Sequence, residues 1–325
     1  MNIDSKLRPI YLAKILYERT DENHYLTTNQ LIQILKDEYG IESYRITVRN
    51  DVRHLKELGM NIEENLSTQM RYHVASRKYD PAELKLLIDA VESAKFISKK
   101  KSQALVEKLM TEVSRYQAAG LKRNLVVEGR VKSENEKSLQ IIDAINDAIN
   151  QGKKISFQMV EHSPKKRRVL HNGGEVYVFS PYSLVWDGDC YYMVGFSDKY
   201  DNIGSHRIDR IADCPKILEE DQAKPPKGFK LETYVNTMFR MFDSEREKVE
   251  LLCENEVMDT LVDRFGTKFK VETVDVDHFM AIVDIAVSHV FYSWVFGFEG
   301  KVKIAGPKNV KETYQKMVQK AMKAL

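Results

Sequence analysis

The chain has 325 residues, of which 43% are hydrophobic and 30% are charged, a composition typical of globular rather than disordered or fibrous proteins. This length predicts two or three domains. The formal net charge of +2 excludes a uniformly basic surface, so a nucleic-acid contact would have to come from local clusters of Lys and Arg.

The N-terminal residues lack the apolar core and small-residue cleavage site of a signal peptide, and no stretch has the roughly 18 apolar residues that cross a bilayer. The three cysteines, Cys190, Cys214 and Cys253, are far apart and form no CxxC pair, which argues against a disulfide framework or a zinc site. We therefore expect a cytoplasmic protein that makes no membrane contact.

The first 79 residues show the pattern of a small helical domain that ends in a β-hairpin. Three helices are predicted, at residues 8–18, 27–40 (with Thr27 or Thr28 as its cap) and 44–59. Two short extended runs follow, at residues 60–64 and 70–75, with polar residues between them. Two helices joined by a short turn and followed by a hairpin form a winged helix-turn-helix, in which the second helix of the pair enters the major groove of DNA.

The third predicted helix has one basic face and one apolar stripe. The stripe comprises Ile46 or Thr47, then Val48, Val52, Leu55 and Leu58. Arg and Asn side chains make bidentate hydrogen bonds to guanine and adenine edges, whereas the later Arg53 and Lys56 are expected at phosphates. The DNA-contacting residues that we predict are Tyr44, Arg45, Thr47, Arg49, Asn50, Arg53 and Lys56, with Arg71 from the hairpin. The alternative is a solvated basic face on an ordinary helix.

This head resembles the winged helix of the DeoR-like regulators. Their usual run of Thr, an apolar residue, any residue, Arg, Asp and an apolar residue corresponds to Thr47-Val48-Arg49-Asn50-Asp51-Val52. Asn50 stands where Arg is usual, and Arg49 is next to it. The resemblance implies DNA binding and leaves the base preference open.

Residues 80–150 are predicted to be a helical linker or dimerisation region. Asp80-Pro81-Ala82-Glu83 is a helix-start signal with a cap, a Pro at the first helical position and a Glu at the third. Helices are predicted at residues 81–97, 101–116 and 136–150, with an extended or linking segment at 122–133.

From residue 151 to 222 the hydrophobic period changes to two, which indicates strands. Five are predicted, at residues 154–160, 167–171, 175–186, 190–197 and 204–211, and tight turns between them favour a small, strongly curved antiparallel sheet. A Pro- and Gly-containing linker at 225–228 precedes the last domain, 229–325. Its βαββαβ order predicts a ferredoxin-like unit, followed by a final helix from about Pro307. The predicted fold class is therefore α+β.

The middle segment resembles a WYL domain, an Sm-like curved sheet found behind such heads in many bacterial regulators. The resemblance lies in Ser180-Pro181-Tyr182-Ser183-Leu184-Val185, in Cys190-Tyr191-Tyr192-Met193-Val194 and in His206-Arg207-Ile208-Asp209-Arg210-Ile211. In the tripeptide that names the family only Tyr191 is kept. The last domain, with its Trp294–Phe298 stretch, resembles the C-terminal extension that accompanies WYL domains.

The WYL resemblance implies a sensor that binds an anionic effector, such as a nucleotide or a short oligonucleotide. The effector-binding residues that we predict are Ser180, Tyr182, Tyr191, His206, Arg207 and Arg210. Strand alternation places Arg207 on the face opposite Ile208, with Arg210 at the rim. Asp209 is expected to pair with an Arg, and the run at 165–168 is either a polyanion contact or a solvated loop.

Motifs for nucleotide hydrolysis, dinucleotide binding, zinc proteolysis and serine hydrolysis are missing from the sequence, and no two histidines have metal-ligand spacing on a predicted helix. We expect no catalysis, no cofactor and no metal. The favoured interpretation is a transcriptional regulator, a repressor in preference to an activator, that binds double-stranded operator DNA as a homodimer. The alternative is an accessory protein that binds single-stranded nucleic acid without operator specificity.

Overall fold

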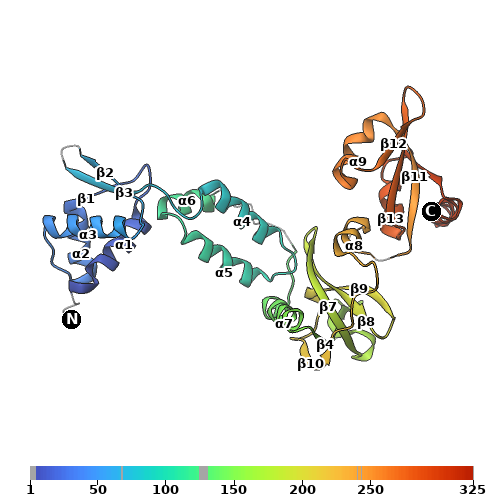
Figure 1. Cartoon of the computed structure of the whole chain (residues 1–325), viewed down its shortest axis with the longest axis horizontal. Coiled ribbons are helices and arrows are strands. Elements are labelled where there is room, and N and C mark those ends of the chain that lie inside the picture. Colours follow the sequence, from blue (N-terminus) through green and yellow to red (C-terminus); the bar gives the residue numbers. More distant parts are fainter. Residues whose placement is uncertain (1–4, 67–68, 124–130, 240, 243, 325) are drawn as a thin grey trace. The chain divides into compact units, whose positions relative to one another are not determined.

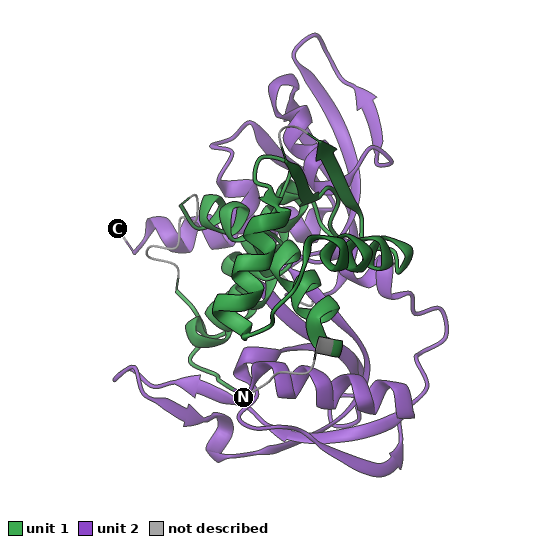
Figure 2. Cartoon of the chain, turned by 90° about the vertical axis from the view of Figure 1, so that its left-hand side faces the viewer, with its two compact units in different colours: residues 1–136 green, residues 137–325 purple. Residues whose placement is uncertain are grey.

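The computed structural model describes residues 5–66, 69–123, 131–239, 241–242 and 244–324. The chain divides into two compact units, residues 1–136 and 137–325 (Figure 2). None of the described helices has the length and apolarity needed to cross a membrane.

The first part of unit 1, which we call the head, contains three helices and a three-stranded sheet (Figure 1). The elements are α1 (Arg8–Arg19), β1 (Leu26–Thr27), α2 (Thr28–Tyr39), α3 (Arg45–Glu57), β2 (Ile62–Leu66) and β3 (Met70–Val74), with strand order β1-β3-β2. A capping box between Thr27 and Gln30 starts α2, and Gly40, with φ of +66°, ends it. Residues 67–68, between β2 and β3, lie outside the described residues.

The apolar stripe of α3 is narrower than the sequence predicts. Val48, Val52 and Leu55 are buried in the core of the head. Leu58 is 84% exposed, so its assignment to the stripe is wrong. Of the two alternatives at the start of the stripe, Ile46 is 75% exposed and Thr47 is half-buried. Residues on a helix turn by about 100° per position. Ile46 precedes Val48 by two positions and therefore lies nearly opposite to it.

The rest of unit 1, as far as the structure describes it, contains α4 (Pro81–Ser93), α5 (Lys99–Met110) and α6 (Arg115–Arg123). The predicted second helix of this region, 101–116, is interrupted by a break between Met110 and Arg115. Ser114 and Gln117 exchange hydrogen bonds of 3.1 and 3.2 Å between side chain and backbone, which is a capping box that starts α6. The predicted linking segment at 122–133 falls mostly on residues 124–130, outside the described part of the chain.

Unit 2 begins with α7 (Ser138–Gln151), which packs on a five-stranded antiparallel sheet. The strands are β4 (Lys153–Gln158), β7 (Val176–Asp187), β8 (Cys190–Ser197), β9 (Asn202–Arg207) and β10 (Lys216–Asp221), in the order β10-β4-β7-β8-β9. Ile141, Ile145 and Ala148 of α7 contact Ile155 and Phe179 of the sheet. The sequence grouped this helix with the linker at 80–150, whereas its buried side chains belong to the sheet.

Two details of the sheet differ from the prediction. Residues 168–170 (β6, Arg168–Leu170) pair with β5 (Val160–His162) in a separate two-stranded arm, and β10 takes the fifth place in the sheet. The strand predicted at 204–211 ends at Arg207, because a 3-10 turn (Ile208–Arg210) follows it. Side-chain alternation therefore stops before Arg210.

The other face of the sheet is covered by α8 (Leu231–Thr237), where Val194 meets Tyr234 and Met238. The remaining chain folds as a four-stranded antiparallel sheet with helices. Its elements are β11 (Arg246–Glu254), α9 (Met258–Phe265), β12 (Lys270–Thr273), β13 (His278–Ala286), α10 (His289–Phe296), β14 (Val302–Gly306) and α11 (Lys308–Met322), with strand order β12-β13-β11-β14. This is the element order that the sequence predicts.

Candidate functional site

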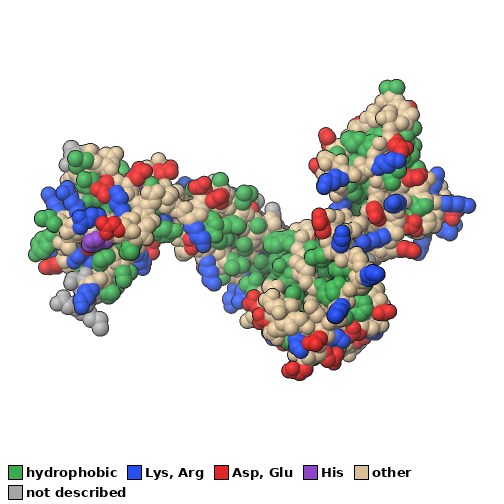
Figure 3. Space-filling view, viewed as in Figure 1, with side chains coloured by type: hydrophobic (Ala, Val, Ile, Leu, Met, Phe, Trp, Pro, Cys, Tyr) green, Lys and Arg blue, Asp and Glu red, His purple; other side chains and the backbone are tan. Residues whose placement is uncertain are grey.

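The outer face of α3 is polar, basic and exposed. Tyr44 at its N-cap is 77% exposed, and Arg49, Asn50 and Arg53 are exposed along the helix. Asp51 is turned inward, where it is buried and forms an ion pair of 2.6 Å with Arg8 of α1. The one acid near the centre of α3 thus leaves the outer face to Arg and Asn, and Figure 3 shows Lys and Arg side chains on the head.

The other predicted DNA contacts are held by partners within the head. The Arg45 side chain donates to Asn29 Oδ1 at 3.0 Å, which ties the start of α3 to the start of α2. Lys56 donates to Glu64 Oε1 of the hairpin at 3.1 Å. Arg71 lies over the Tyr25 ring, 4.0 Å from its centre, and is half-buried. Thr47 is also half-buried, so it is less open to a partner than its neighbours.

Ile46 is a candidate that the sequence reasoning assigned to the core. Its side chain is exposed on the same helix as Arg49 and Asn50, three and four positions away, and residues at that spacing are neighbours on a helix surface. An apolar side chain beside Arg and Asn matches the major groove, where thymine presents a methyl group. The sequence does contain the signal: Ile46 is two positions before Val48, and residues at that spacing face opposite sides of a helix.

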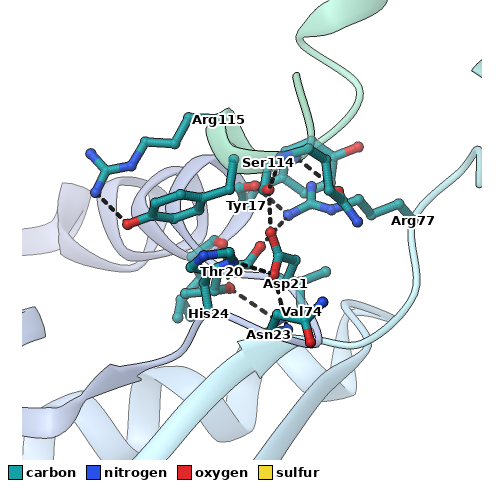
Figure 4. A network of polar contacts seen from close by, with 12 residues as sticks. Tyr17, Thr20, Asp21, Asn23, His24, Val74, Arg77, Ser114 and Arg115 are labelled. Atoms are coloured by element: carbon teal, nitrogen blue, oxygen red, sulfur yellow. Dashed lines mark hydrogen bonds and ion pairs between the residues drawn. The ribbon is translucent and has the colours of Figure 1, made fainter. Parts of the chain in front are cut away.

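A network of polar contacts joins the head to α6 and to the turn before it, within unit 1 (Figure 4). Asp21, which is 3% exposed, accepts hydrogen bonds from Ser114 Oγ and from the Asn23 amide, the latter at 3.0 Å. The His24 ring approaches the same carboxylate at 2.7 Å and stacks on Tyr116 at 3.7 Å between ring centres. The loop between α1 and β1 is therefore fixed to the break that precedes α6.

The charge of Asp21 follows from these contacts. Burial raises the pKa of the Asp21 carboxyl, but the hydrogen bonds with Ser114, His24 and the Asn23 amide together lower it more, so the net pKa lies below its ordinary value. Asp21 is thus a buried carboxylate that is ionised at neutral pH.

Unit 2 contains a cavity of about 470 Å³ beside β9, the edge strand of the five-stranded sheet. Tyr192, Ser205 and Arg207 line it, together with Met241 and Phe242. Ser205 Oγ donates to the Met241 carbonyl at 3.2 Å, which ties β9 to Met241. Phe242, which is 45% exposed, adds an aromatic ring to the lining of the cavity.

Two arginines supply the positive charge of this cavity. Arg207 makes a bidentate pair with Asp209, with N–O distances of 3.0 and 2.7 Å, and this hydrogen bonding raises the pKa of Arg207 above its ordinary value. The pairing expected for Asp209 is confirmed. The Arg207 side chain is 36% exposed, so part of its guanidinium faces the cavity. Arg210 lines the same cavity from the 3-10 turn and lies 3.3 Å from His162 Nδ1.

His206 and Tyr192 act as neutral groups there. Burial lowers the pKa of His206 to about 4, and its ring meets the edges of Phe157 and Phe179, so it is uncharged at neutral pH. Burial likewise raises the pKa of Tyr192 to about 12, which keeps its hydroxyl protonated. Positive charge in the cavity therefore comes from the arginines.

The structure places Ser180, Tyr182 and Tyr191 away from this cavity. Ser180 Oγ accepts from the Ala223 amide at 2.9 Å, and Tyr182 donates to the Ala223 carbonyl at 2.7 Å, so both hold the segment after β10. Tyr191 packs toward α7, because neighbouring residues of a strand face opposite sides. Tyr192, which is paired with Arg207 in the β8–β9 register, takes its place at the cavity.

Sequence reasoning did not find Tyr192, Ser205, Met241 or Phe242. The register of β8 and β9 would have indicated the first two, whereas Met241 and Phe242 come from a segment remote from β9 in sequence. Among the residues that the structure describes, no three His, Cys, Asp or Glu side chains gather in a way that could hold a metal ion.

Comparison with known proteins identifies residues 140–215 as a WYL domain, which confirms that part of the resemblance. No curated protein is similar enough to count as a match. Among solved structures, proteasome accessory factor B/C (PafBC) of Arthrobacter aurescens matches 95% of this chain and 45% of its own, at 16% identity and a TM-score of 0.29. A CRISPR Cas-related protein matches 76% of this chain and 73% of its own, at 14% identity and a TM-score of 0.37. The chain thus spans less than half the length of PafBC.

Proposed function

We propose that this chain is a DNA-binding transcriptional regulator. The observation that carries the proposal is the outer face of α3, where Arg49, Asn50 and Arg53 are exposed while Asp51 is turned inward. The same chain carries a WYL domain with an arginine-lined cavity. A helix with exposed Arg and Asn that follows a short turn is suited to the major groove, and a sensor on the same chain is suited to control it.

In this proposal the head is a winged helix-turn-helix. Arg49 and Asn50 contact base edges, Arg53 contacts phosphate, and the β2–β3 hairpin is the wing. Two copies of the chain bind a two-fold symmetric operator whose half-sites are separated by one or more turns of about 10 base pairs. Repression is the favoured outcome, since a dimer on promoter DNA excludes other proteins from it.

Unit 2, which carries the WYL domain and which we call the WYL half, senses an anionic effector, a nucleotide or an oligonucleotide. Arg207 and Arg210 attract its phosphates, since guanidinium groups bind phosphate in a bidentate geometry. Tyr192 and Phe242 offer a hydroxyl and an aromatic ring to the rest of the ligand. To bind phosphate, the Arg207 guanidinium must give up at least one of its hydrogen bonds to Asp209. Ligand binding can drive this change in pairing. The proposal includes no catalytic step and no cofactor, and it places the protein in the cytoplasm.

A fluorescence titration with the DNA directly upstream of the gene tests the proposal, with random duplex and single-stranded competitors at about 150 mM salt. Binding should exceed that of random duplex by about a thousandfold or more. Equal binding to both duplexes would refute operator recognition, and displacement by single strand alone would favour the accessory-protein alternative.

Arg207→Ala separates sensing from DNA binding. The variant should keep the DNA affinity of the effector-free protein and lose the response to a nucleotide or oligonucleotide that shifts the wild type. A variant that still responds fully would remove Arg207 from the effector site.

A further inference from the structure

The positive charge of this protein is concentrated at its C-terminal end. Residues 301–325 contain seven Lys and one acid, Glu312, although the whole chain has a net charge of only +2. The other 300 residues are therefore net negative. Figure 3 shows Lys and Arg side chains on the C-terminal part of unit 2.

Three of these lysines share one exposed side at the C-terminal half of α11. Val310 is buried, and Tyr314 and Met317 pack against the core of the four-stranded sheet. At about 100° per residue, the exposed Lys316, Lys320 and the C-cap residue Lys323 lie within about 60° of one another on a solvent-exposed side of the helix, one turn apart. The helix has 15 residues and is therefore about 22 Å long.

Some lysines elsewhere in the protein have an acidic partner. Lys154 is paired with both Asp198 and Glu220, and Lys301 is paired with Glu256. Within the described residues, no ion pair involves Lys311, Lys316, Lys320 or Lys323. Lys308 lies 3.7 Å from Glu312, the one acid of the helix. The face thus presents a row of cations whose counter-charge is not supplied by nearby side chains.

We propose that this face of α11 is a second, sequence-independent contact with the phosphate backbone of duplex DNA. Lysine suits this role because its ammonium is a point charge that meets phosphates without reading bases. A membrane surface fits less well, because an interfacial helix must insert its apolar side, and here that side is already packed on the sheet. The choice of duplex DNA as the polyanion rests on the proposed function.

The test compares two triple variants of the full chain in binding to a labelled duplex of random sequence between 50 and 200 mM salt. The first variant carries Lys316→Gln, Lys320→Gln and Lys323→Gln. The matched control carries Lys224→Gln, Lys227→Gln and Lys230→Gln, which removes the same charge from exposed lysines before α8. Circular dichroism verifies that both variants fold.

Each phosphate contact contributes about 0.9 to the slope of log affinity against log salt. If the three lysines each meet a phosphate, wild type should lose about 40-fold more affinity than the first variant over this fourfold range of salt. The control should follow the wild type. Equal slopes for all three proteins, or an equal decrease in both variants, would overturn the proposal.

Random duplex also keeps this test separate from the proposed function. A wild type that binds its operator but not random duplex at 50 mM salt would refute the α11 contact and leave operator recognition intact. A wild type that binds random duplex through α11 but shows no preferred operator would support the α11 contact and refute operator recognition. Binding to phosphatidylserine vesicles that depends on the three lysines, without such binding to duplex, would assign the face to a membrane surface and overturn the DNA contact.

Discussion

Replacing Asp21 by Ala should destabilise unit 1 more than any exposed substitution in it, because the carboxylate is the centre of the joint between the head and α6 (Figure 4). The substitution removes the acceptor for Ser114 Oγ, the Asn23 amide and the His24 ring. It also leaves the Ser114 hydroxyl, which is fully buried, without this partner.

The expected magnitude follows from these three contacts. A hydrogen bond to a charged group contributes about 1.5–3 kcal/mol, and a buried donor without a partner costs about 1–3 kcal/mol. Because the contacts share one carboxylate they are not additive, and we expect a loss of about 3–5 kcal/mol for Asp21→Ala. Ser114→Ala should cost about half as much. The double variant should cost less than the sum of the two single variants.

The effect should depend on pH in a defined direction. Since the pKa of Asp21 is lower in the folded protein than its unfolded value of about 3.9, its stabilisation is complete above that value. It is lost as pH falls through the folded pKa. The difference between wild type and Asp21→Asn should therefore be largest at pH 6–7 and shrink toward pH 2.

Both tryptophans, Trp186 and Trp294, lie in unit 2, which allows the two units to be followed separately in the intact chain. In urea unfolding, far-ultraviolet circular dichroism reports both units, whereas tryptophan fluorescence reports unit 2. Asp21→Ala should shift the dichroism transition and leave the fluorescence transition in place. Asp37→Ala, an exposed acid on α2, is the control and should shift neither by more than about 0.5 kcal/mol. An unshifted dichroism transition for Asp21→Ala would refute the role of the network.

Three further outcomes are expected. Arg49→Ala should weaken operator binding by about 1–3 kcal/mol and relax the sequence preference, whereas Arg53→Ala should weaken binding to all sequences evenly. Fluorescence titrations with operator and random duplex distinguish the two variants, and identical profiles would contradict the placement of α3. Because burial lowers the pKa of His206 to about 4, against about 6.5 unfolded, protonation favours unfolding, and unit 2 should lose up to about 3 kcal/mol between pH 7 and 4. This loss, followed by tryptophan fluorescence, should be smaller in His206→Phe, and an unchanged pH profile would show that another group titrates. Gly195→Ala should lower the free energy of unfolding of unit 2 by about 3 kcal/mol in the same fluorescence assay, since the added Cβ would collide with the Ser180 carbonyl oxygen. A variant as stable as the wild type would mean that β7 and β8 can separate locally.

The sequence predicted those elements whose hydrophobic pattern is strong. The helices of the head, α7 and the strands β7 and β8 have clear periods of 3.6 or 2, because one side of each is buried. β10 lacked this signal. It is an edge strand with mostly exposed side chains, so hydrophobic alternation does not mark it. The start of α6 was marked by Ser114 and Gln117 at capping-box spacing, a signal that the sequence analysis did not use.

A candidate site could be predicted well when its residues are close together in the sequence, and poorly when they come from distant segments. The α3 face is formed by one helix, so Arg49, Asn50 and Arg53 follow from sequence spacing alone. The cavity depends on strand register and on a distant segment, so Arg207 was predicted while Tyr192 and Phe242 were not. Ser180 and Tyr182, which were predicted to bind the effector, do not line this cavity and form hydrogen bonds with Ala223.

The packing of α7 determines where this chain can be divided. Ile141, Ile145 and Ala148 are fully buried against the sheet, so a fragment that starts at residue 151 would leave Ile155 and Phe179 open to water and would be prone to aggregate. A fragment that starts at residue 137 keeps this helix and the Lys137–Asp213 ion pair at its beginning. For a calorimetric test of the proposed effector binding on a shorter protein without the head, residue 137 is therefore the start that the packing favours.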